Sequence, residues 1–146
     1  MSIPNIRAAN QKELAFETLW NRDSCSVTFE YVRSWLNAAE AANPTFYGLY
    51  ITGSWIITGE HRPYDRNIGF ARRVIPDRHW GAVELVARYS RIDPTNKAID
   101  GGLMDIGHFG VNWFLNRRWK IGAATGIIGL DRFGMPGLTN SVEARL

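Results

Sequence analysis

The sequence predicts an all-β protein, an antiparallel up-and-down β-barrel that crosses a membrane. In residues 80–91, Val83 and Leu85 fall on one face of an extended chain. Glu84 and Arg88 fall on the other face, and this period of two residues is that of a strand rather than a helix. Charged residues make up only 21% of the 146-residue chain and aromatic residues 12%, with six Trp. That balance favours a membrane or interface protein over an ordinary soluble domain.

Seven segments of the chain alternate in this way and are predicted to be strands. Gly, Pro, Asn and Asp, the residues that favour turns, bound most of them. We expect a single partial barrel domain over residues 1–146, with a linker at 1–10 and strands near 12–20, 24–35, 46–58, 80–91, 103–115, 119–130 and 139–146.

The N-terminal half predicts a hairpin followed by a third strand. Residues 21–23, Asn-Arg-Asp, form a tight polar turn between the first two strands. Residues 36–45 are a longer loop with one helical turn ahead of Pro44. After the third strand, residues 59–79 form a long irregular connection that is rich in Arg and interrupted by Pro.

The C-terminal half continues the pattern of strands and turns. Residues 92–102 are a polar loop with Asp-Pro and Gly-Gly signals, and residues 116–118 are a second tight turn. Residues 131–138, which contain Gly and Pro, are expected to form the loop before the final strand.

Loop lengths divide between the two ends of the predicted barrel. In strict up-and-down order the two tight turns share one end, and the loops at 36–45, 92–102 and 131–138 share the other. Short turns on one side and longer loops on the other are typical of outer-membrane barrels. The connection at 59–79 is an exception, since it is long and lies on the short-turn side.

Four tryptophans fall at the short-turn end, namely Trp20, Trp80, Trp113 and Trp119. At that position they predict an aromatic girdle where the barrel meets the membrane surface. The alternative is that these side chains belong to the buried core of a soluble sheet.

The sequence carries neither a spanning helix nor an export signal. No apolar run approaches the ~20 residues that a spanning helix needs. Residues 1–10 lack the charged and apolar regions of a secretory signal peptide. Because an outer-membrane protein must be exported, we expect this chain to lack its natural N-terminal part. Cys25 is the single cysteine, which excludes an intrachain disulfide, and we expect it to be structural.

Charge and motifs exclude several classes of function. The net charge is only +3 and the basic residues are scattered, whereas a nucleic-acid-binding surface gathers them. The three His lack metal-ligand spacing, and no GxSxG, HExxH, CxxC or phosphate-binding loop occurs. We therefore expect no enzyme, no metal and no other cofactor. Ser90 with His108 is the only candidate catalytic pair, and a place on the lumen wall is the preferred interpretation of His108.

Three stretches of the sequence carry a family resemblance. They are GSWIITGEHRPYDRNIGFAR at 53–72, GAVELVARYSRID at 81–93 and HFGVNWFLNRRWKIG at 108–122. In this order they resemble the C-terminal half of the phosphate-selective porins O and P of Gram-negative outer membranes. The resemblance extends from about residue 47 over nearly all of the remaining chain.

The resemblance implies a sixteen-stranded barrel of which this chain supplies about seven strands. It further implies a homotrimer in the bacterial outer membrane, with lipid against the apolar faces and passive diffusion of small anions such as phosphate or polyphosphate. The chain departs from the family because it lacks the signal peptide and the first half, and because it stops short of the expected terminal aromatic residue. An odd number of strands cannot close an up-and-down barrel, so we expect a partial barrel or fragment.

Anion passage requires cationic groups along a water-filled lumen. Inward parity predicts six pore-lining residues, Glu84, Arg88, His108, Lys120, Glu143 and Arg145. Each cation in this set is expected to be opposed by a nearby acid, either Glu84 or Glu143. The connection adds a basic loop at the periplasmic mouth, which either funnels anions or is only solvated, and which contains Arg62, Arg66, Arg72, Arg73 and Arg78. Within it, Glu60 and Arg62 are expected to pair and hold the turn.

Two other interpretations remain open. In a small soluble β-barrel like a lipocalin, Val83, Leu85 and their counterparts would line an interior that binds an apolar ligand. A structural outer-membrane barrel without transport is the second. Detergent dependence separates the soluble barrel from the porin, because the soluble barrel would stay monomeric in buffer.

Overall fold

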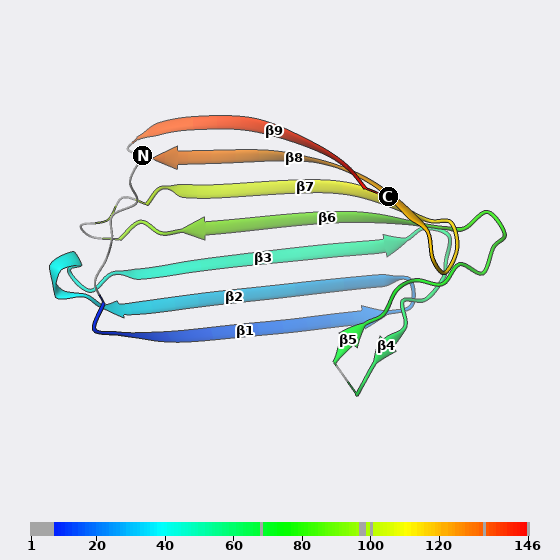
Figure 1. The fold of residues 1–146 in the computed structure, drawn as a ribbon, viewed down its shortest axis with the longest axis horizontal. Coiled ribbons are helices and arrows are strands. Elements are labelled where there is room, and N and C mark those ends of the chain that lie inside the picture. The colour runs from blue at the N-terminus through cyan, green and yellow to red at the C-terminus, as the bar shows by residue number, and fades with distance from the viewer. Residues whose placement is uncertain (1–7, 68, 97–98, 100, 133, 146) are drawn as a thin grey trace.

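Seven long strands form one antiparallel sheet in the computed structural model, which describes residues 8–67, 69–96, 99, 101–132 and 134–145 (Figure 1). The strand order in this sheet is β1-β2-β3-β6-β7-β8-β9, and β4 pairs with β5 in a small second sheet. The strands are β1 (Asn10–Arg22), β2 (Cys25–Asn37), β3 (Thr45–Ile56), β4 (Tyr64–Asp65), β5 (Phe70–Ala71), β6 (Ala82–Asp93), β7 (Leu103–Phe114), β8 (Lys120–Arg132) and β9 (Met135–Arg145). This arrangement confirms the predicted all-β, antiparallel, up-and-down fold.

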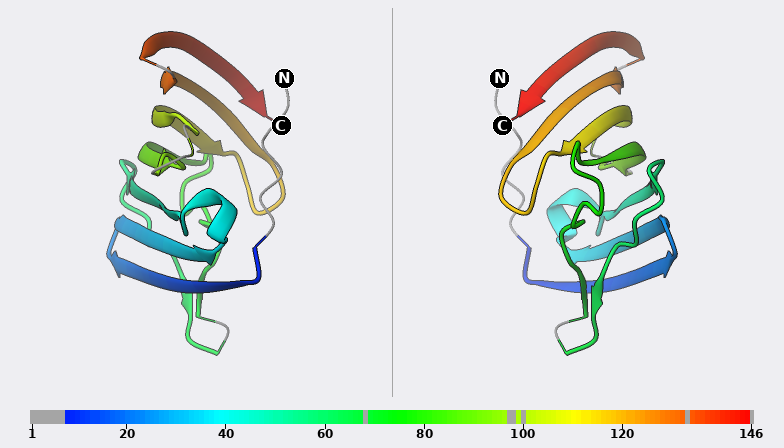
Figure 2. Two further views of the ribbon diagram at one scale, coloured as in Figure 1. Left: turned by 90° about the vertical axis from the view of Figure 1, so that its left-hand side faces the viewer. Right: turned by 90° about the vertical axis from the view of Figure 1, so that its right-hand side faces the viewer.

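The sheet is bent into an open arc when it is viewed along the strands (Figure 2). β1 and β9 are its edges, and within the described residues each has one neighbouring strand. A short 3-10 helix, η1 (Ala39–Ala41), occupies the helical turn expected before Pro44. No helix in the described ranges has the length and apolar character needed to cross a membrane. The predicted linker falls largely on residues 1–7, which lie outside the described residues, as does Leu146 at the end of the predicted last strand.

The turn between β1 and β2 is tight, as predicted, but it lies at residues 23–24 rather than 21–23, because Asn21 and Arg22 belong to β1. Arg22 pairs with Cys25, so only Asp23 and Ser24 connect the two strands. Asp23 has a φ of 53°, a left-handed conformation that Asp tolerates because its short polar side chain can bond to the local backbone.

The predicted loop at 131–138 is wrong. β8 continues to Arg132 and β9 begins at Met135, and these two residues pair directly. Gly134 between them has a φ of 68°, so the connection is a tight turn that uses a left-handed glycine. Pro136 suggested a loop, but an edge strand such as β9 can hold a proline where its nitrogen faces away from the neighbour. The predicted contrast in loop length is therefore incomplete.

Alternation along the strands sorts the side chains onto two faces of the sheet, and the register aligns like with like across the strands. One row on the apolar face consists of Cys25, Trp55, Leu85, Val111 and Ala123. A row on the polar face consists of Thr28, Thr52, Arg88, His108 and Gly126.

Large side chains of the apolar face are exposed along the whole sheet. Phe16 on β1 is 57% exposed, Phe109 on β7 is 61% exposed and Ile127 on β8 is 58% exposed. Soluble monomers rarely expose apolar patches larger than a few hundred Å². This face therefore requires an apolar surrounding.

A small buried core lies on the polar face instead, at the end of the sheet that carries the tight turns 23–24 and 115–119 (the tight-turn end). There the β3–β6 connection (residues 57–81) folds back over the sheet. Its Val74 is fully buried against Ile56, Ala82 and Phe114. The connection was predicted to be irregular, but it contains the β4–β5 hairpin, which projects past β1 at this end (Figures 1 and 2).

A substitution at Gly81, the last residue of the β3–β6 connection, tests how closely the connection packs against the sheet. Its φ is 104°, and a Cβ there would collide with the carbonyl oxygen of Phe114. We expect Gly81→Ala to lower the free energy of unfolding by about 2 kcal/mol or more, because left-handed strain of about 1–2 kcal/mol adds to the collision. Denaturant titration in detergent micelles, followed by circular dichroism, measures the loss.

Gly59→Ala is the matched control. Gly59 has a φ of 94° but open space where a Cβ would stand, so it should lose only the backbone strain of about 1 kcal/mol. Equal losses of unfolding free energy in the two variants would show that the structure around Gly81 accommodates the added Cβ without loss of stability.

Candidate lumen wall

The polar face brings together all six residues that were predicted to line a pore. They come from four neighbouring strands and are Glu84 and Arg88 on β6, His108 on β7, Lys120 on β8, and Glu143 and Arg145 on β9. All of them except Glu84 border one open hollow of about 630 Å³. The structure thus places the set on one surface, and its function as a pore lining stays a prediction.

Glu84 is a buried structural partner, with only 3% of its surface exposed. One carboxylate oxygen accepts a hydrogen bond from the Arg62 guanidinium, and the other accepts one from Asn112 Nδ2 at 2.9 Å. The carbonyl oxygen of Arg62 in turn accepts a hydrogen bond from Asn21 Nδ2 at 2.9 Å. These contacts fasten the β3–β6 connection to the sheet, and we call the Arg62–Glu84 pair the latch.

The expected pairing of Glu60 with Arg62 is wrong. Arg62 pairs with Glu84, whereas Glu60 accepts a hydrogen bond from the Thr58 hydroxyl and is 4% exposed. Thr58 Oγ1 also accepts the backbone N–H of Val83 at 3.1 Å. Residues close in sequence were the natural candidates, but the fold offers Arg62 a buried acid from the next long strand.

Arg88 lies mid-strand on the polar face and is not opposed by Glu84 as expected. Four residues of extended chain separate the two by about 13 Å, because a strand rises about 3.3 Å per residue. The Arg88 guanidinium instead lies 3.8 Å from the centre of the Tyr50 ring and donates from Nε to Ser90 Oγ at 3.0 Å. Among the described residues, no carboxylate forms an ion pair with Arg88.

His108 lies directly across from Arg88 on β7. Its ring covers Gly126 on β8, where a Cβ would stand 2.8 Å from His108 Nε2. Ser90, the other half of the candidate catalytic pair, is across from Ile106 and accepts its hydrogen bond from Arg88. The arrangement suits a wall, in which the His108 ring occupies the space that the missing side chain of Gly126 leaves open.

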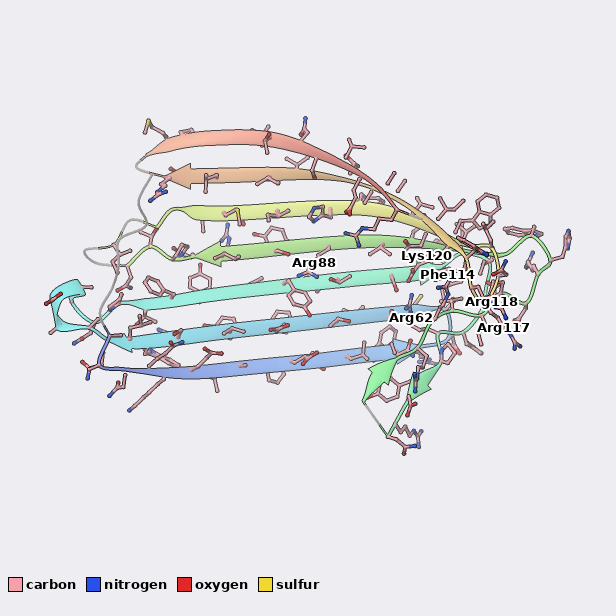
Figure 3. The ribbon with its side chains drawn as sticks, viewed as in Figure 1. Arg62, Arg88, Phe114, Arg117, Arg118 and Lys120 are labelled. Atoms are coloured by element: carbon pink, nitrogen blue, oxygen red, sulfur yellow. The ribbon has the colours of Figure 1, made fainter. Side chains whose placement is uncertain are left out.

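A second group of cations gathers at the tight-turn end, where Figure 3 shows Arg62, Lys120, Arg117 and Arg118 around Phe114. Lys120 Nζ on β8 lies 5.9 Å from the centre of the Phe114 ring. The guanidinium of Arg73, from the β3–β6 connection, lies 5.7 Å from the same centre. Sequence analysis assigned Arg73 and Lys120 to separate groups, and no local signal linked them, because only the folded connection brings them to one ring.

The other basic residues of the connection have separate environments. Arg72 donates to Asp65 from Nε at 3.2 Å and from a terminal nitrogen at 2.6 Å. Arg78 donates to the carbonyl oxygen of Thr58 at 3.3 Å. Arg66 is exposed. The predicted basic loop is thus a folded segment in which some cations are neutralised and others are free of acids.

Three acidic side chains on the polar face gather toward the β1 edge of the sheet. Glu17 on β1 and Glu30 on β2 are directly opposite each other, and Glu13 follows on the same face of β1. On β9, Glu143 pairs with Arg145 as expected from their parity, in an exposed contact that contributes little. The cations Arg88 and Lys120 are on β6 and β8, so charge is divided across the wall.

Two rows of aromatic side chains border the apolar face. Trp20 and Trp113 lie toward the tight-turn end, as predicted, and the structure adds Trp55 to their row. The opposite end carries a row that sequence analysis did not identify, with Tyr31, Trp35 and Tyr47. From Tyr47 to Trp55 the strand covers about 27 Å, or about 20 Å of depth at a tilt of ~40°, similar to the ~25 Å apolar band of outer-membrane barrels.

At the level of the second aromatic row the apolar face becomes polar, since Arg91 is across from Leu49 and Arg33 is across from Tyr47. Arg91 makes a two-pronged contact with Asp105, at 2.7 and 2.9 Å, and the Tyr89 hydroxyl donates to the same carboxylate. Arg33 lies over the Trp35 ring at 5.1 Å. Charged groups that begin where an apolar band ends are typical of the head-group level of a membrane.

Comparison with known proteins gives one family. The family described as "Phosphate-selective porin O and P" matches residues 5–126 of the 146. No curated protein sequence matches the chain significantly. In the described ranges, no three His, Cys, Asp or Glu side chains are grouped so as to hold a metal ion.

The latch predicts a difference between two Glu→Gln variants. Glu84→Gln leaves the largely buried Arg62 guanidinium without a counter-charge and should lower the free energy of unfolding by about 3 kcal/mol. Glu143→Gln removes an exposed ion pair and should change it by no more than about 0.5 kcal/mol. Denaturant titration in micelles measures both, and a Glu84→Gln variant as stable as the parent would show that the latch carries no stability.

Proposed function

Because the chain belongs to the phosphate-selective porin O and P family, an outer-membrane porin family, we propose that it forms part of a barrel wall through which small anions diffuse, phosphate among them. The apolar face contacts outer-membrane lipid, and the polar face lines the water-filled lumen. The full assembly is a homotrimer in the bacterial outer membrane, and the chain is not an enzyme.

The observation that carries this proposal is the exposed apolar face between two aromatic rows. A lipid-facing band with aromatic girdles at both interfaces is the outer surface of a membrane barrel. The opposite face of the same strands carries Arg88, His108 and Lys120, which need water. Because apolar and polar side chains alternate along a single layer of strands, the two faces of the sheet are suited to hydrocarbon on one side and water on the other.

The edges of the sheet support a larger barrel. β1 and β9 each present backbone N–H and C=O groups that no described strand pairs. Hydrocarbon cannot satisfy these groups, so only closed barrels of strands cross membranes. We therefore assign this chain to a segment of wall that further strands complete.

The distribution of charge supports anions as the cargo. Arg88, Arg73 and Lys120 lack ion-pair partners among the described carboxylates. Such cations attract anions and release them readily into water, as a conducting path requires. The anion path then runs along β6–β8, away from Glu17 and Glu30.

The soluble β-barrel with an apolar interior has less support. In that arrangement Val83 and Leu85 would share a shielded interior, whereas their face carries Phe109 at 61% exposure and Ile127 at 58% exposure. A structural barrel without transport shares the lipid-facing band, and it differs only in lacking ion selectivity.

Nitroxide labels test which face meets lipid. In a Cys25→Ser background, single cysteines at Leu85 and Arg88 are labelled, and the assembled barrel is reconstituted into lipid bilayers. We expect the label at 85 to collide mainly with oxygen, which concentrates in hydrocarbon, and the label at 88 to collide mainly with a water-soluble nickel chelate. A label at Phe109 is the control for the apolar face of the next strand. Reversed preferences at 85 and 88 would refute the membrane assignment.

Charge reversal at Arg88 tests anion passage. In planar bilayers, channels of the assembled barrel should show an anion-selective zero-current potential under a KCl gradient. Arg88→Glu should lower the ratio of anion to cation permeability by roughly fivefold. Two units of charge at about 8 Å in water shift the energies of an anion and of a cation by about 1 kcal/mol each in opposite directions, and salt screening over about one Debye length removes roughly half of this. Arg33→Glu, on the outward face, is the matched control and should leave the ratio unchanged. An unchanged ratio for Arg88→Glu would contradict a lumen-facing role.

A further inference from the structure

A pocket of about 390 Å³ at the tight-turn end joins the β3–β6 connection to the sheet. Its charged lining consists of Arg62, Arg72, Arg73, Lys120 and Glu84. The connection supplies the first three, β8 supplies Lys120 and β6 supplies Glu84. The pocket exists only because the connection is folded against the polar face.

Ion pairing leaves two of these charges uncompensated. Arg62 is paired with Glu84 in the latch, and Arg72 is paired with Asp65 at 2.6 Å. Neither Arg73 nor Lys120 forms an ion pair with any described carboxylate, and both lie within 6 Å of the Phe114 ring centre. The face of an aromatic ring steadies cations without neutralising them. The pocket therefore keeps about two positive charges.

We propose that Arg73, held over Phe114 by the latch, and Lys120 of β8 form a binding site for a doubly charged inorganic oxyanion at the mouth of the lumen. This inference rests on the proposed function and assigns a subsite to the path. Two flexible cationic side chains from different elements can close on a tetrahedral anion from two sides. A single chloride offers half the charge and no spread of acceptor oxygens.

The lining predicts that this site does not distinguish phosphate from sulfate. Discrimination for monohydrogen phosphate requires an acceptor for its O–H, which sulfate lacks. Both oxygens of Glu84 are already engaged, by Arg62 and by Asn112. Asn112 Oδ1 is directed toward Gly122 of the neighbouring strand, which does not line the pocket. The remaining side chains offer donors alone, so the site selects by charge and shape.

In this proposal the latch acts by positioning Arg73, and this role can be distinguished from a direct electrostatic effect of Glu84 on the anion. Simple electrostatics predicts that loss of the negative charge of Glu84 strengthens the binding of anions. If the latch holds the connection in place, the same loss releases Arg73 from Phe114 and weakens binding. Glu84 is then a positioning residue, and the two accounts predict effects of opposite sign.

Titration calorimetry on the full chain in non-ionic detergent micelles tests the site, at constant ionic strength, with inorganic phosphate, sulfate and chloride as probes. We expect phosphate and sulfate to bind within about threefold of each other and chloride at least about tenfold more weakly. Arg73→Gln with Lys120→Gln should weaken phosphate binding about tenfold or more, since two charged hydrogen bonds are lost. Arg66→Gln is the matched control, an exposed cation of the same connection that does not line the pocket, and should change binding by less than about twofold.

The latch is tested by Glu84→Gln, which should weaken phosphate binding severalfold, and by the exchange of Arg62→Glu with Glu84→Arg, which should recover much of it. Unchanged binding in the Arg73→Gln and Lys120→Gln double variant would overturn the site. Tighter binding in Glu84→Gln would overturn the role of the latch, and phosphate binding more than about tenfold tighter than sulfate would overturn selection by charge alone. The nitroxide and Arg88 experiments do not involve these residues, so failure of the oxyanion site would not contradict the proposed porin function. Conversely, reversed label preferences together with intact oxyanion binding would reject the porin wall but not the site.

Discussion

Pairing of the backbone between neighbouring strands is the constraint on which this wall depends. Each spanning strand must satisfy its N–H and C=O groups on its neighbours, because hydrocarbon offers them no partner. The register is continuous from β1 to β9, apart from the β3–β6 connection, which lies outside the main sheet. Once the register is set, side chains must alternate between faces, and a slip of one residue would exchange Leu85 for Glu84 on the lipid side.

This constraint explains why the buried core is small and lies at one end. A barrel wall is a single layer, so most of its apolar side chains face lipid rather than one another. The buried apolar cluster lies where the β3–β6 connection covers the polar face, at Val74 and Phe114, and further buried residues, Ala38 and Pro44, lie in the β2–β3 loop. A buried ion pair adds little net stability compared with apolar residues in the same place. It does restrict position, because a guanidinium whose counter-charge is a single buried acid must stay beside that acid. The latch therefore specifies position more than it adds stability.

The strands were predictable from the sequence because alternation is a local property. Leu85 and Arg88 sort onto opposite faces in any extended chain, so the facing of all seven strands followed without knowledge of the neighbours. The start of β9 was not predictable, because Pro136 reads as a loop unless the strand is known to be an edge. The six predicted residues share the polar face for the same local reason, and their role as a pore lining stays a prediction.

The partners of those residues depend on distant contacts and were mostly missed. Arg62 and Glu84 are 22 residues apart, and only the folded connection joins them. Arg73 and Lys120 meet at Phe114 for the same reason. Alternation along the sequence thus identified which side chains share a face. The ion pairs, which decide which cations remain available to an anion, could be found only in the three-dimensional structure.

The environment of Arg88 is the strongest argument that the polar face is wet. Its partners are a neutral hydroxyl, Ser90, and the ring of Tyr50. A guanidinium removed from water loses several kcal/mol of hydration, and these two contacts do not replace it. Ala87, the preceding residue, points to the opposite face beside Phe109, where hydration would be unfavourable for the apolar surface. A single strand can satisfy both residues only if water lies on one side of it and hydrocarbon on the other, which is the arrangement of a barrel around an aqueous lumen.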